Sequence, residues 1–396
     1  MDQAGIYIHI PFCERKCTYC NFNTTDFDKL LAAGYIDAVK REIAYWGRHL
    51  SEASSDHGRR VGVDSIFFGG GTPSIVDPVE LGALISACEE AFQVDPGAEI
   101  TIEINPATIL QSKAEGWLRA GINRVSVGVQ SFLDRELATL SRTHTADDAR
   151  RTVAELRRAG FKNLSLDLIA GLPEQTISDW EYNLSQALDA SPEHLSLYLL
   201  EIKDGTQLYG QIKRGIRPMP DEDLAAEMYR AICETTARSG FEQYEISNFA
   251  LRPASASDCP KSNPYRSRHN LKYWRGIPFY GMGCGAHSYD GRDRWSNIKR
   301  TESYIESVSR TGCAVADRNT LSDADRAAEA LFMGLRLIEG VDLAGFRERY
   351  GLDVERAYGG DLNRLAEAGL VEFQHGYLKL TQTGLVLSNE VFQIFV

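Results

Sequence analysis

Short apolar segments alternate with longer amphipathic segments through the first half of the chain. Six apolar segments are short and rich in β-branched or aromatic residues, as strands buried on both faces of a sheet are: Ile6–Ile10, Ser65–Phe68, Glu99–Ile104, Arg124–Val129, Leu164–Ile169 and His194–Leu200. The amphipathic segments between them are predicted to be helices: Asp28–His49, Pro78–Ala91, Ser112–Ala120, Thr145–Ala159 and Thr176–Leu188. Six β–α units in series predict a parallel sheet with right-handed crossovers. Because a closed barrel needs eight such units, the predicted fold is α/β with an open, partial (β/α)6 barrel.

The last part of the chain has a different pattern, which begins near residue 320. It predicts three helices and a hairpin with Gly376 in its turn: Ser322–Leu337, Asp342–Tyr350, Asp361–Ala368 and Val371–Leu380. This arrangement resembles a winged-helix-like α+β domain. We therefore expect a partial-barrel domain over residues 1–250, a loop-like connecting region over 251–319 and a C-terminal domain over 320–396.

Composition narrows the classes of function. At 396 residues the chain is long enough for a large domain and a smaller one. The net charge of −12 argues against a broad basic face, so we expect no nucleic-acid partner. The sequence shows no signal peptide, and no apolar run reaches the ~18 residues that cross a bilayer. These features predict a cytoplasmic protein.

Three cysteines carry the strongest chemical signal. Cys13, Cys17 and Cys20 follow the first predicted strand at C-x3-C-x2-C spacing. Thiolates favour iron–sulfur clusters or zinc. A structural zinc site normally has four protein ligands, and no second cysteine pair completes such a set here. Three thiolates suit a [4Fe–4S] cluster with one open iron, and zinc remains the alternative.

Polar residues follow several of the predicted strands. Gly69-Gly-Gly-Thr-Pro73 comes after the second strand, Glu103 and Gln130 end the third and fourth, and Asp167 lies within the fifth. The carboxyl ends of parallel strands meet at one edge, so these residues and Arg142 are expected to surround one mouth. Carboxylates suit ribose hydroxyls and an ammonium, while Arg suits a carboxylate. The set fits an amino-acid nucleoside better than a phosphate, although each residue alone is explained equally well by ordinary structural pairing.

The ordered combination of C-x3-C-x2-C, GGGTP, ExNP, GVQ and LDLIAGLP resembles the radical S-adenosylmethionine (SAM) superfamily. Within it, the chain is similar to the group that contains oxygen-independent coproporphyrinogen III oxidase and the HemW haem chaperones. The resemblance implies that Cys13, Cys17 and Cys20 ligate a [4Fe–4S] cluster whose open iron binds SAM. It also implies that the tail domain covers the mouth of the barrel. The residues implied to line the SAM site are Tyr7, Tyr19, Gly70, Gly71, Thr72, Glu103, Gln130, Arg142 and Asp167.

Two departures separate the chain from the oxidase. The oxidase motif continues to a fourth cysteine, and the matching position here is Phe22. The oxidase also has an N-terminal extension, whereas six residues precede Tyr7 in this sequence. Both departures match the chaperone branch.

The segment His269-Asn-Leu-Lys-Tyr-Trp274 matches the H-N-x-x-Y-W motif associated with haem binding in HemW proteins. The resemblance implies that His269 ligates haem iron, since imidazole is a good axial ligand. Residues implied to contact the porphyrin are Asn270, Tyr273 and Trp274. The alternative is that these side chains are ordinary packing, and His287 is a weaker candidate ligand.

These features together predict a haem chaperone. It would bind haem, a [4Fe–4S] cluster and SAM, and deliver haem to acceptors such as respiratory membrane proteins. The alternative is an oxygen-independent coproporphyrinogen III oxidase, and the sequence leaves open whether the chain is an enzyme. A third possibility is that SAM is a structural or regulatory ligand. Peripheral membrane contact and a homodimer are both compatible with these interpretations.

Overall fold

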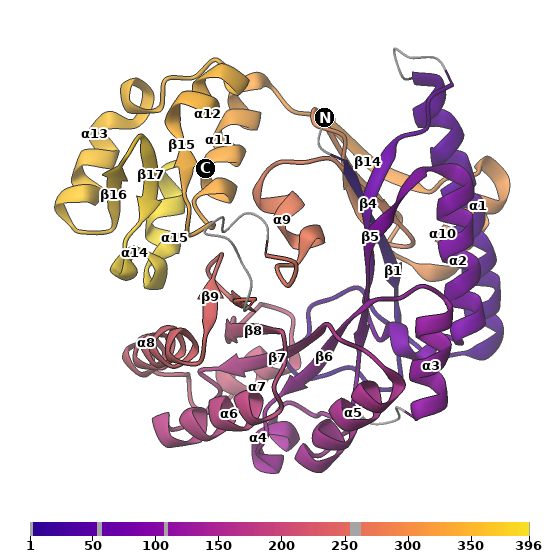
Figure 1. Cartoon of the computed structure of the whole chain (residues 1–396), viewed down its shortest axis with the longest axis horizontal. Helices are drawn as coiled ribbons and strands as arrows, with labels where there is room; N and C mark the ends of the chain where they lie inside the picture. Colours follow the sequence, from indigo (N-terminus) through magenta and orange to yellow (C-terminus); the bar gives the residue numbers. More distant parts are fainter. Residues whose placement is uncertain (1–2, 54–57, 107–109, 254–262, 396) are drawn as a thin grey trace.

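A twelve-stranded sheet runs through most of the chain, with the strand order β14-β13-β12-β11-β1-β4-β5-β6-β7-β8-β10-β9 (Figure 1). The computed structural model describes residues 3–53, 58–106, 110–253 and 263–395. Neighbouring strands in the centre of the sheet are parallel: β1 (Ala4–Ile10), β4 (Gly62–Gly70), β5 (Gln93–Ile104), β6 (Arg124–Gln130), β7 (Leu164–Ala170) and β8 (His194–Leu199). They are the six predicted strands, so the open partial barrel is confirmed.

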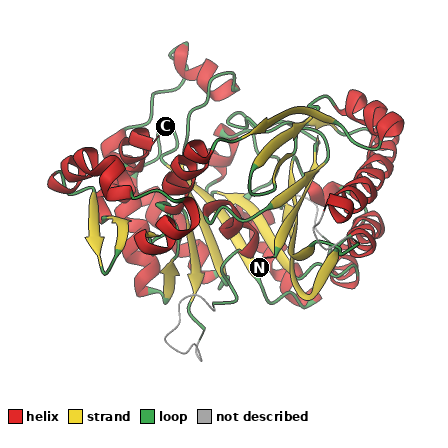
Figure 2. Ribbon diagram, turned by 90° about the horizontal axis from the view of Figure 1, so that it is seen from above, coloured by secondary structure: helices red, strands yellow, loops and turns green. Residues whose placement is uncertain are grey.

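The predicted helices pack on the outer face of this sheet (Figure 2). The helices between the central strands are α1 (Lys29–Ala53), α2 (Pro78–Ala91), α3 (Gln111–Arg119), α4 (Asp134–Thr139), α5 (Ala146–Ala159) and α6 (Ile177–Asp189). Two of them begin with a capping box, in which Thr145 or Thr176 and an aspartate three residues later satisfy each other's backbone N–H groups. Helix α5 ends at Gly160, whose φ of 109° suits glycine.

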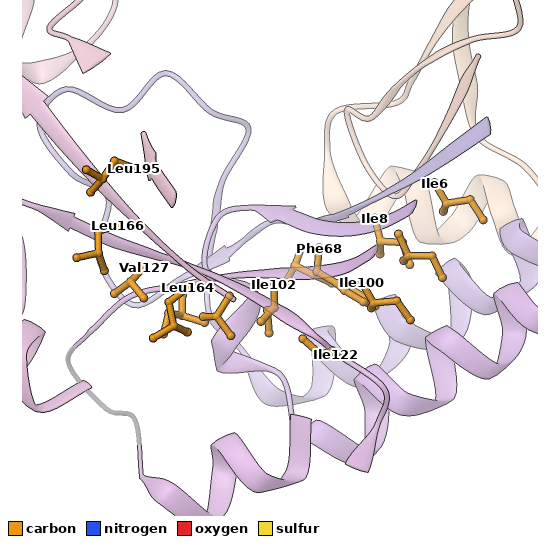
Figure 3. Packing of buried hydrophobic residues seen from close by; sticks show 14 of the residues in the cluster. Ile6, Ile8, Phe68, Ile100, Ile102, Ile122, Val127, Leu164, Leu166 and Leu195 are labelled. Carbon is orange, nitrogen blue, oxygen red and sulfur yellow. The ribbon is translucent and has the colours of Figure 1, made fainter. Parts of the chain in front are cut away.

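Apolar and polar side chains alternate along the central strands, so the apolar core lies on one face of the sheet and the polar barrel interior on the other. Ile8, Phe68 and Ile102 are fully buried and lie in the layer between the sheet and the helices (Figure 3). Successive side chains of a strand point to opposite faces. Residues between the core positions, such as Thr101 and Asp167, therefore face the interior of the barrel. The sequence pattern thus places polar groups inside the barrel and apolar groups outside it.

Further strands extend both edges of the sheet. One edge carries the antiparallel strands β10 and β9, and on the other edge β11 pairs parallel with β1 and is followed by antiparallel strands. These strands are β9 (Phe241–Gln243), β10 (Asn248–Leu251), β11 (Phe279–Met282), β12 (His287–Tyr289), β13 (Asp293–Asn297) and β14 (Val315–Thr320). Helices α7 (Gln207–Lys213), α8 (Glu222–Arg238) and α10 (Thr301–Thr311) accompany them. Short strands β2 (Phe12–Cys13) and β3 (Thr25–Asp26) pair with each other.

The haem motif lies on helix α9 (Arg268–Trp274), which corrects the prediction of a loop. Ser267 caps this helix by accepting a hydrogen bond from the Asn270 backbone N–H, and no glycine or proline follows before Gly276. Residues 254–262 of the predicted loop-like segment lie outside the described residues. The division of the chain at residues 251 and 320 stays a prediction.

The C-terminal region has the predicted helices and hairpin. Its elements are α11 (Asp323–Gly334), β15 (Val341–Asp342), α12 (Leu343–Tyr350), α13 (Val354–Glu367), β16 (Val371–Gln374), β17 (Tyr377–Leu380), α14 (Gln382–Val386) and α15 (Ser388–Phe392). The hairpin turn places His375 and Gly376 at positive φ. Helix α13 begins before the predicted Asp361, because Asp353 caps it by accepting from the Arg356 N–H. No helix in the described part of the chain combines the length and apolarity needed to cross a membrane.

The C-terminal region packs against α9, which lies between it and the barrel (Figure 1). Arg349 of α12 donates hydrogen bonds to the carbonyl oxygens of Arg275, at 3.2 Å, and Gly276, at 2.9 Å. Arg275 also pairs with Glu339 at 3.1 Å. Arg349 therefore satisfies backbone carbonyls at the C-terminal end of α9.

Candidate functional site

A cavity of about 360 Å³ opens at the carboxyl ends of the central strands. We term it the cluster cavity. Every residue predicted to hold the cluster or SAM lines it, except Tyr7: Cys13, Cys17, Tyr19, Cys20, Gly70, Gly71, Thr72, Glu103, Gln130, Arg142 and Asp167. The structure thus brings together side chains that are up to about 150 positions apart in the sequence, as expected for the mouth of a parallel barrel.

The three cysteines are free, half-buried thiols that follow β1. Cys13 ends the short strand β2, and Cys17 and Cys20 lie on the loop after it; residues 13–23 are termed the cysteine loop. The Sγ atom of Cys13 lies 3.6 Å from the Thr72 hydroxyl, and Cys17 Sγ accepts a hydrogen bond from Arg142 Nη1 at 3.5 Å. Burial raises the pKa of the Cys13 and Cys20 thiols, so binding iron would release protons from them.

The donor set fits a cluster. Among the described residues, no group of three His, Cys, Asp or Glu side chains is spaced to hold a single metal ion. In a [4Fe–4S] cluster each thiolate binds a different iron, so the sulfur atoms need not converge on one point.

Arg142 is held rigidly at the wall of the cluster cavity. Its Nη2 donates to the Gly128 carbonyl at 2.7 Å and to Asn105 Oδ1 at 3.0 Å. Its Nε is buried and has no hydrogen-bond partner among the described residues. An unpaired buried donor costs about 1–3 kcal/mol. A ligand carboxylate is the chemical group that this guanidinium suits.

Two half-buried carboxyl groups, those of Glu103 and Asp167, line the barrel interior near each other. Glu103 Oε2 accepts a hydrogen bond from the Gly70 N–H at 3.2 Å, and Ser126 Oγ donates to both Asp167 oxygens at 2.8 and 2.9 Å. Burial, followed by the nearby Asp167 carboxylate, raises the pKa of Glu103 to about 8. In the ligand-free protein Glu103 is therefore mostly protonated at neutral pH, and the pair carries less than its full negative charge.

We expect this group to make the stability of the ligand-free protein depend on pH. An unfolded glutamate loses its proton near its ordinary pKa, whereas folded Glu103 keeps it up to about pH 8. Stability is therefore fully present at acidic pH and falls as pH rises, by roughly 3 kcal/mol between about pH 5 and pH 8. Glu103→Gln, which mimics the neutral acid, should flatten this dependence in urea unfolding curves. Glu90→Gln, at an exposed position of α2, is the control, and equal slopes for both variants would contradict the assignment.

Gln130 reaches the cavity through an irregularity of the backbone. The register of β6 against β7 shifts between Val127 and Gln130, and Gln130 has a φ of 66°. Bulges re-aim side chains next to functional sites, and a non-glycine residue at positive φ is strained. The sequence predicted the residue but not the bulge that directs it.

Tyr7 and part of the haem motif line a second cavity, of about 220 Å³, inside the barrel. His269 is 1 % exposed, and both of its ring nitrogens are hydrogen-bonded: Nδ1 to Ser65 Oγ at 3.0 Å and Nε2 to Tyr273 OH at 2.9 Å. Burial, followed by the charge of Lys272, lowers the pKa of His269 to about 3. In this arrangement His269 has no free nitrogen for iron.

The other motif residues occupy different surroundings. Asn270 and Tyr273 line the inner cavity, whereas Trp274 packs under the guanidinium of Arg336 at 4.3 Å from its ring centre. The motif is therefore divided between the barrel interior and the contact with the C-terminal region.

Sequence reasoning missed the wall formed by the end of β8. At this end of the strand the cluster cavity is lined by Tyr198, Leu199, Leu200, Glu201 and Lys203. The rule that sites form at the carboxyl ends of strands pointed to this strand end too, but it lacks a recognisable motif.

The implied covering of the mouth by the tail domain is wrong for this structure. Lining residues in the described part of the chain end at Lys203, and the tail contacts α9 instead.

Comparisons with known proteins agree with this geometry. Residues 7–186 match the radical SAM superfamily, and residues 321–387 match the HemN C-terminal domain. The protein named heme chaperone HemW from Bacillus subtilis (strain 168) is 32% identical over 391 residues, covering 98% of each chain. HemW from Synechocystis sp. is 37% identical, covering 86% of this chain and 80% of its own. The mitochondrial radical S-adenosyl methionine domain-containing protein 1 of Bos taurus is 35% identical, covering 98% and 86%.

Among solved structures, coproporphyrinogen III oxidase (HemN) from Escherichia coli superposes with a TM-score of 0.81. The match covers 99% of this chain and 90% of HemN at 22% identity, so it shows the shared fold. Membership of the radical SAM superfamily implies a [4Fe–4S] cluster and SAM, and the thiols, Arg142 and the paired carboxyls described above suit both groups. From the near full-length similarity at more than 30% identity, the chain belongs to the HemW family of the radical SAM superfamily.

Proposed function

We propose that this protein is a haem chaperone. It binds haem and, with a [4Fe–4S] cluster and SAM in the cluster cavity, delivers haem to acceptor proteins. The observation that carries the proposal is the similarity to proteins named heme chaperone HemW over nearly the full length of both chains. The H-N-x-x-Y-W segment and the phenylalanine at the position of the oxidase's fourth cysteine support it.

In this proposal the cluster cavity has one task for each group of side chains. Cys13, Cys17 and Cys20 hold the cluster, which supplies an open iron position and single electrons when it is bound. Arg142 pairs with the carboxylate of SAM, and the carboxyl pair of Glu103 and Asp167 accepts hydrogen bonds from ribose hydroxyls. The same side chains would fix SAM whether it is cleaved or serves as a structural or regulatory ligand.

The proposal also includes the acceptors of haem, the assembly of the protein and the ligand to the haem iron. Respiratory membrane proteins are the proposed acceptors, reached from the cytoplasm through peripheral contact with the membrane. A homodimer is the proposed assembly. For the haem iron itself, the sequence-based proposal is His269, whose ring would first have to leave Ser65 and Tyr273.

Haem binding and transfer by the anaerobically reconstituted protein test the proposal. We expect a Soret band on titration with haem, and loss of that band when an apo-haem protein is added as acceptor. With reductant, SAM and coproporphyrinogen III we expect no catalytic formation of protoporphyrinogen. Turnover of coproporphyrinogen III would identify an oxidase instead, and failure to bind haem would exclude a chaperone.

A further inference from the structure

A groove of about 610 Å³ opens beside the cluster cavity, where β11 and β12 extend the sheet. We term it the side groove. Its walls come from Tyr7 and His9 of β1, from residues 21–23 after the cluster cysteines, from Tyr273 and Phe279, and from residues 285–287 with Lys299. His9 is buried, and its two ring nitrogens are hydrogen-bonded to the Tyr7 hydroxyl and the Asn23 carbonyl. Its volume lies within the range of about 300–1,000 Å³ that is usual for sites of small molecules and cofactors.

His287 is the accessible imidazole of this groove. It begins β12 opposite Ser296 and is solvent-exposed, and its ring forms no hydrogen bond or ion pair with any described residue. Partial desolvation at the groove wall, followed by the positive charges of Lys299 and Arg294, lowers the pKa of His287. This shift favours the neutral ring, which is the form that binds iron. His269, by contrast, has both ring nitrogens engaged.

The rest of the groove suits a flat, apolar ligand that carries carboxylates. Phe22 is 60% exposed and lines the groove, so its ring is accessible to a ligand. Tyr273 packs edge-on against Phe279, with ring centres 4.6 Å apart. Lys299 is exposed, and its ammonium forms no ion pair within the described part of the chain. Aromatic walls, an open imidazole and a free cation match the ring, iron and propionates of haem.

We propose that the side groove is the haem site and that His287, rather than His269, is the axial ligand to the haem iron. Lys299 pairs with a propionate, and Phe22 and Tyr273 pack against the porphyrin. This inference rests on the proposed haem-chaperone function. Phe22 lines both the cluster cavity and the side groove, so bound haem would contact the loop that carries the cluster ligands.

In this proposal the haem motif supports the site indirectly, because His269 holds Tyr273 in place. His269 accepts or donates a hydrogen bond at the Tyr273 hydroxyl, which fixes the tyrosine ring at the wall of the side groove. His269 is therefore a positioning residue in this proposal. Its loss should loosen the wall and weaken haem binding without changing the ligand of the iron.

Haem titration of the full-length protein tests the assignment, with SAM binding and thermal unfolding as checks on folding. We expect His287→Ala to weaken haem binding by more than about tenfold and to replace the imidazole-ligated spectrum. Lys299→Ala should weaken binding about threefold and keep the spectrum. His269→Ala should also keep the imidazole-ligated spectrum. His375→Asn is the matched control, since His375 is an exposed histidine at positive φ in the C-terminal hairpin and Asn tolerates that backbone.

The possible results distinguish an incorrect haem site from an incorrect chaperone function. If the unaltered protein binds haem and His287→Ala binds it with the same affinity and spectrum, the side groove is the wrong site while the chaperone function stands. Loss of the imidazole spectrum in His269→Ala, with retention in His287→Ala, would return the ligand to His269. Absence of haem binding by the unaltered protein would overturn both proposals.

Discussion

Replacing any one of the three loop cysteines with alanine is expected to abolish the [4Fe–4S] cluster. Each thiolate of such a cluster binds its own iron, so two remaining ligands leave a second iron open. The neighbouring Thr72 and Arg142 contact Cys13 and Cys17 as hydrogen-bond partners, and a hydroxyl or guanidinium does not replace a thiolate as an iron ligand. Iron and sulfide content after anaerobic reconstitution should therefore fall to background, together with the visible absorbance of the cluster.

Cys233→Ala is the matched control for this prediction. Cys233 is also a half-buried free cysteine, but it lies on α8 and contacts Gln243 rather than the cluster cavity. It should retain the iron and sulfide content of the unaltered protein. Stoichiometric zinc in place of iron in anaerobically prepared protein would contradict the cluster assignment and favour the zinc alternative.

The arrangement of the barrel could be predicted because it depends on the local alternation of apolar and polar residues along each strand. Alternation along β5 and β7 assigns Ile102 and Leu166 to the core, and Glu103 and Asp167 to the opposite face, without any knowledge of distant contacts. The parallel order of the strands then brings their carboxyl ends together. This is why the lining of the cluster cavity was predicted well from the sequence.

Features that depend on tertiary contacts were not predictable in the same way. The bulge at Gln130 depends on pairing between β6 and β7, and the place of β11 in the sheet depends on its pairing with β1 at the other end of the chain. The burial of His269 depends on Ser65, which is 204 positions away in the sequence. A motif identifies residue types at a fixed spacing, but it does not show which of them remains accessible.

Gly71 is the position where a small change should have the largest effect on SAM binding. Its N–H donates to the Ile10 carbonyl at 2.7 Å, and an added Cβ would lie 2.7 Å from the carbonyl oxygens of Pro11 and Phe12. These atoms are backbone, so they cannot rotate away as a side chain can. A larger residue at Gly71 must therefore displace either the start of the cysteine loop or the glycine turn (residues 69–73) from the wall of the cluster cavity.

We expect Gly71→Val to weaken SAM binding strongly and to lower cluster occupancy as well. Overpacking of this kind costs about 1–3 kcal/mol in the native geometry. The free protein relieves this strain by displacing the wall, and SAM binding must restore it, so the same energy corresponds to roughly a 5- to 150-fold loss of affinity. Binding measured by calorimetry on the reconstituted protein tests this, and Gly71→Ala serves as the milder variant if the valine variant does not fold. Gly34→Ala is the control, because Gly34 lies on α1 with no atom within 4 Å of an added Cβ. Unchanged SAM affinity in a folded Gly71→Val protein would mean that the glycine turn does not form the wall of the SAM site.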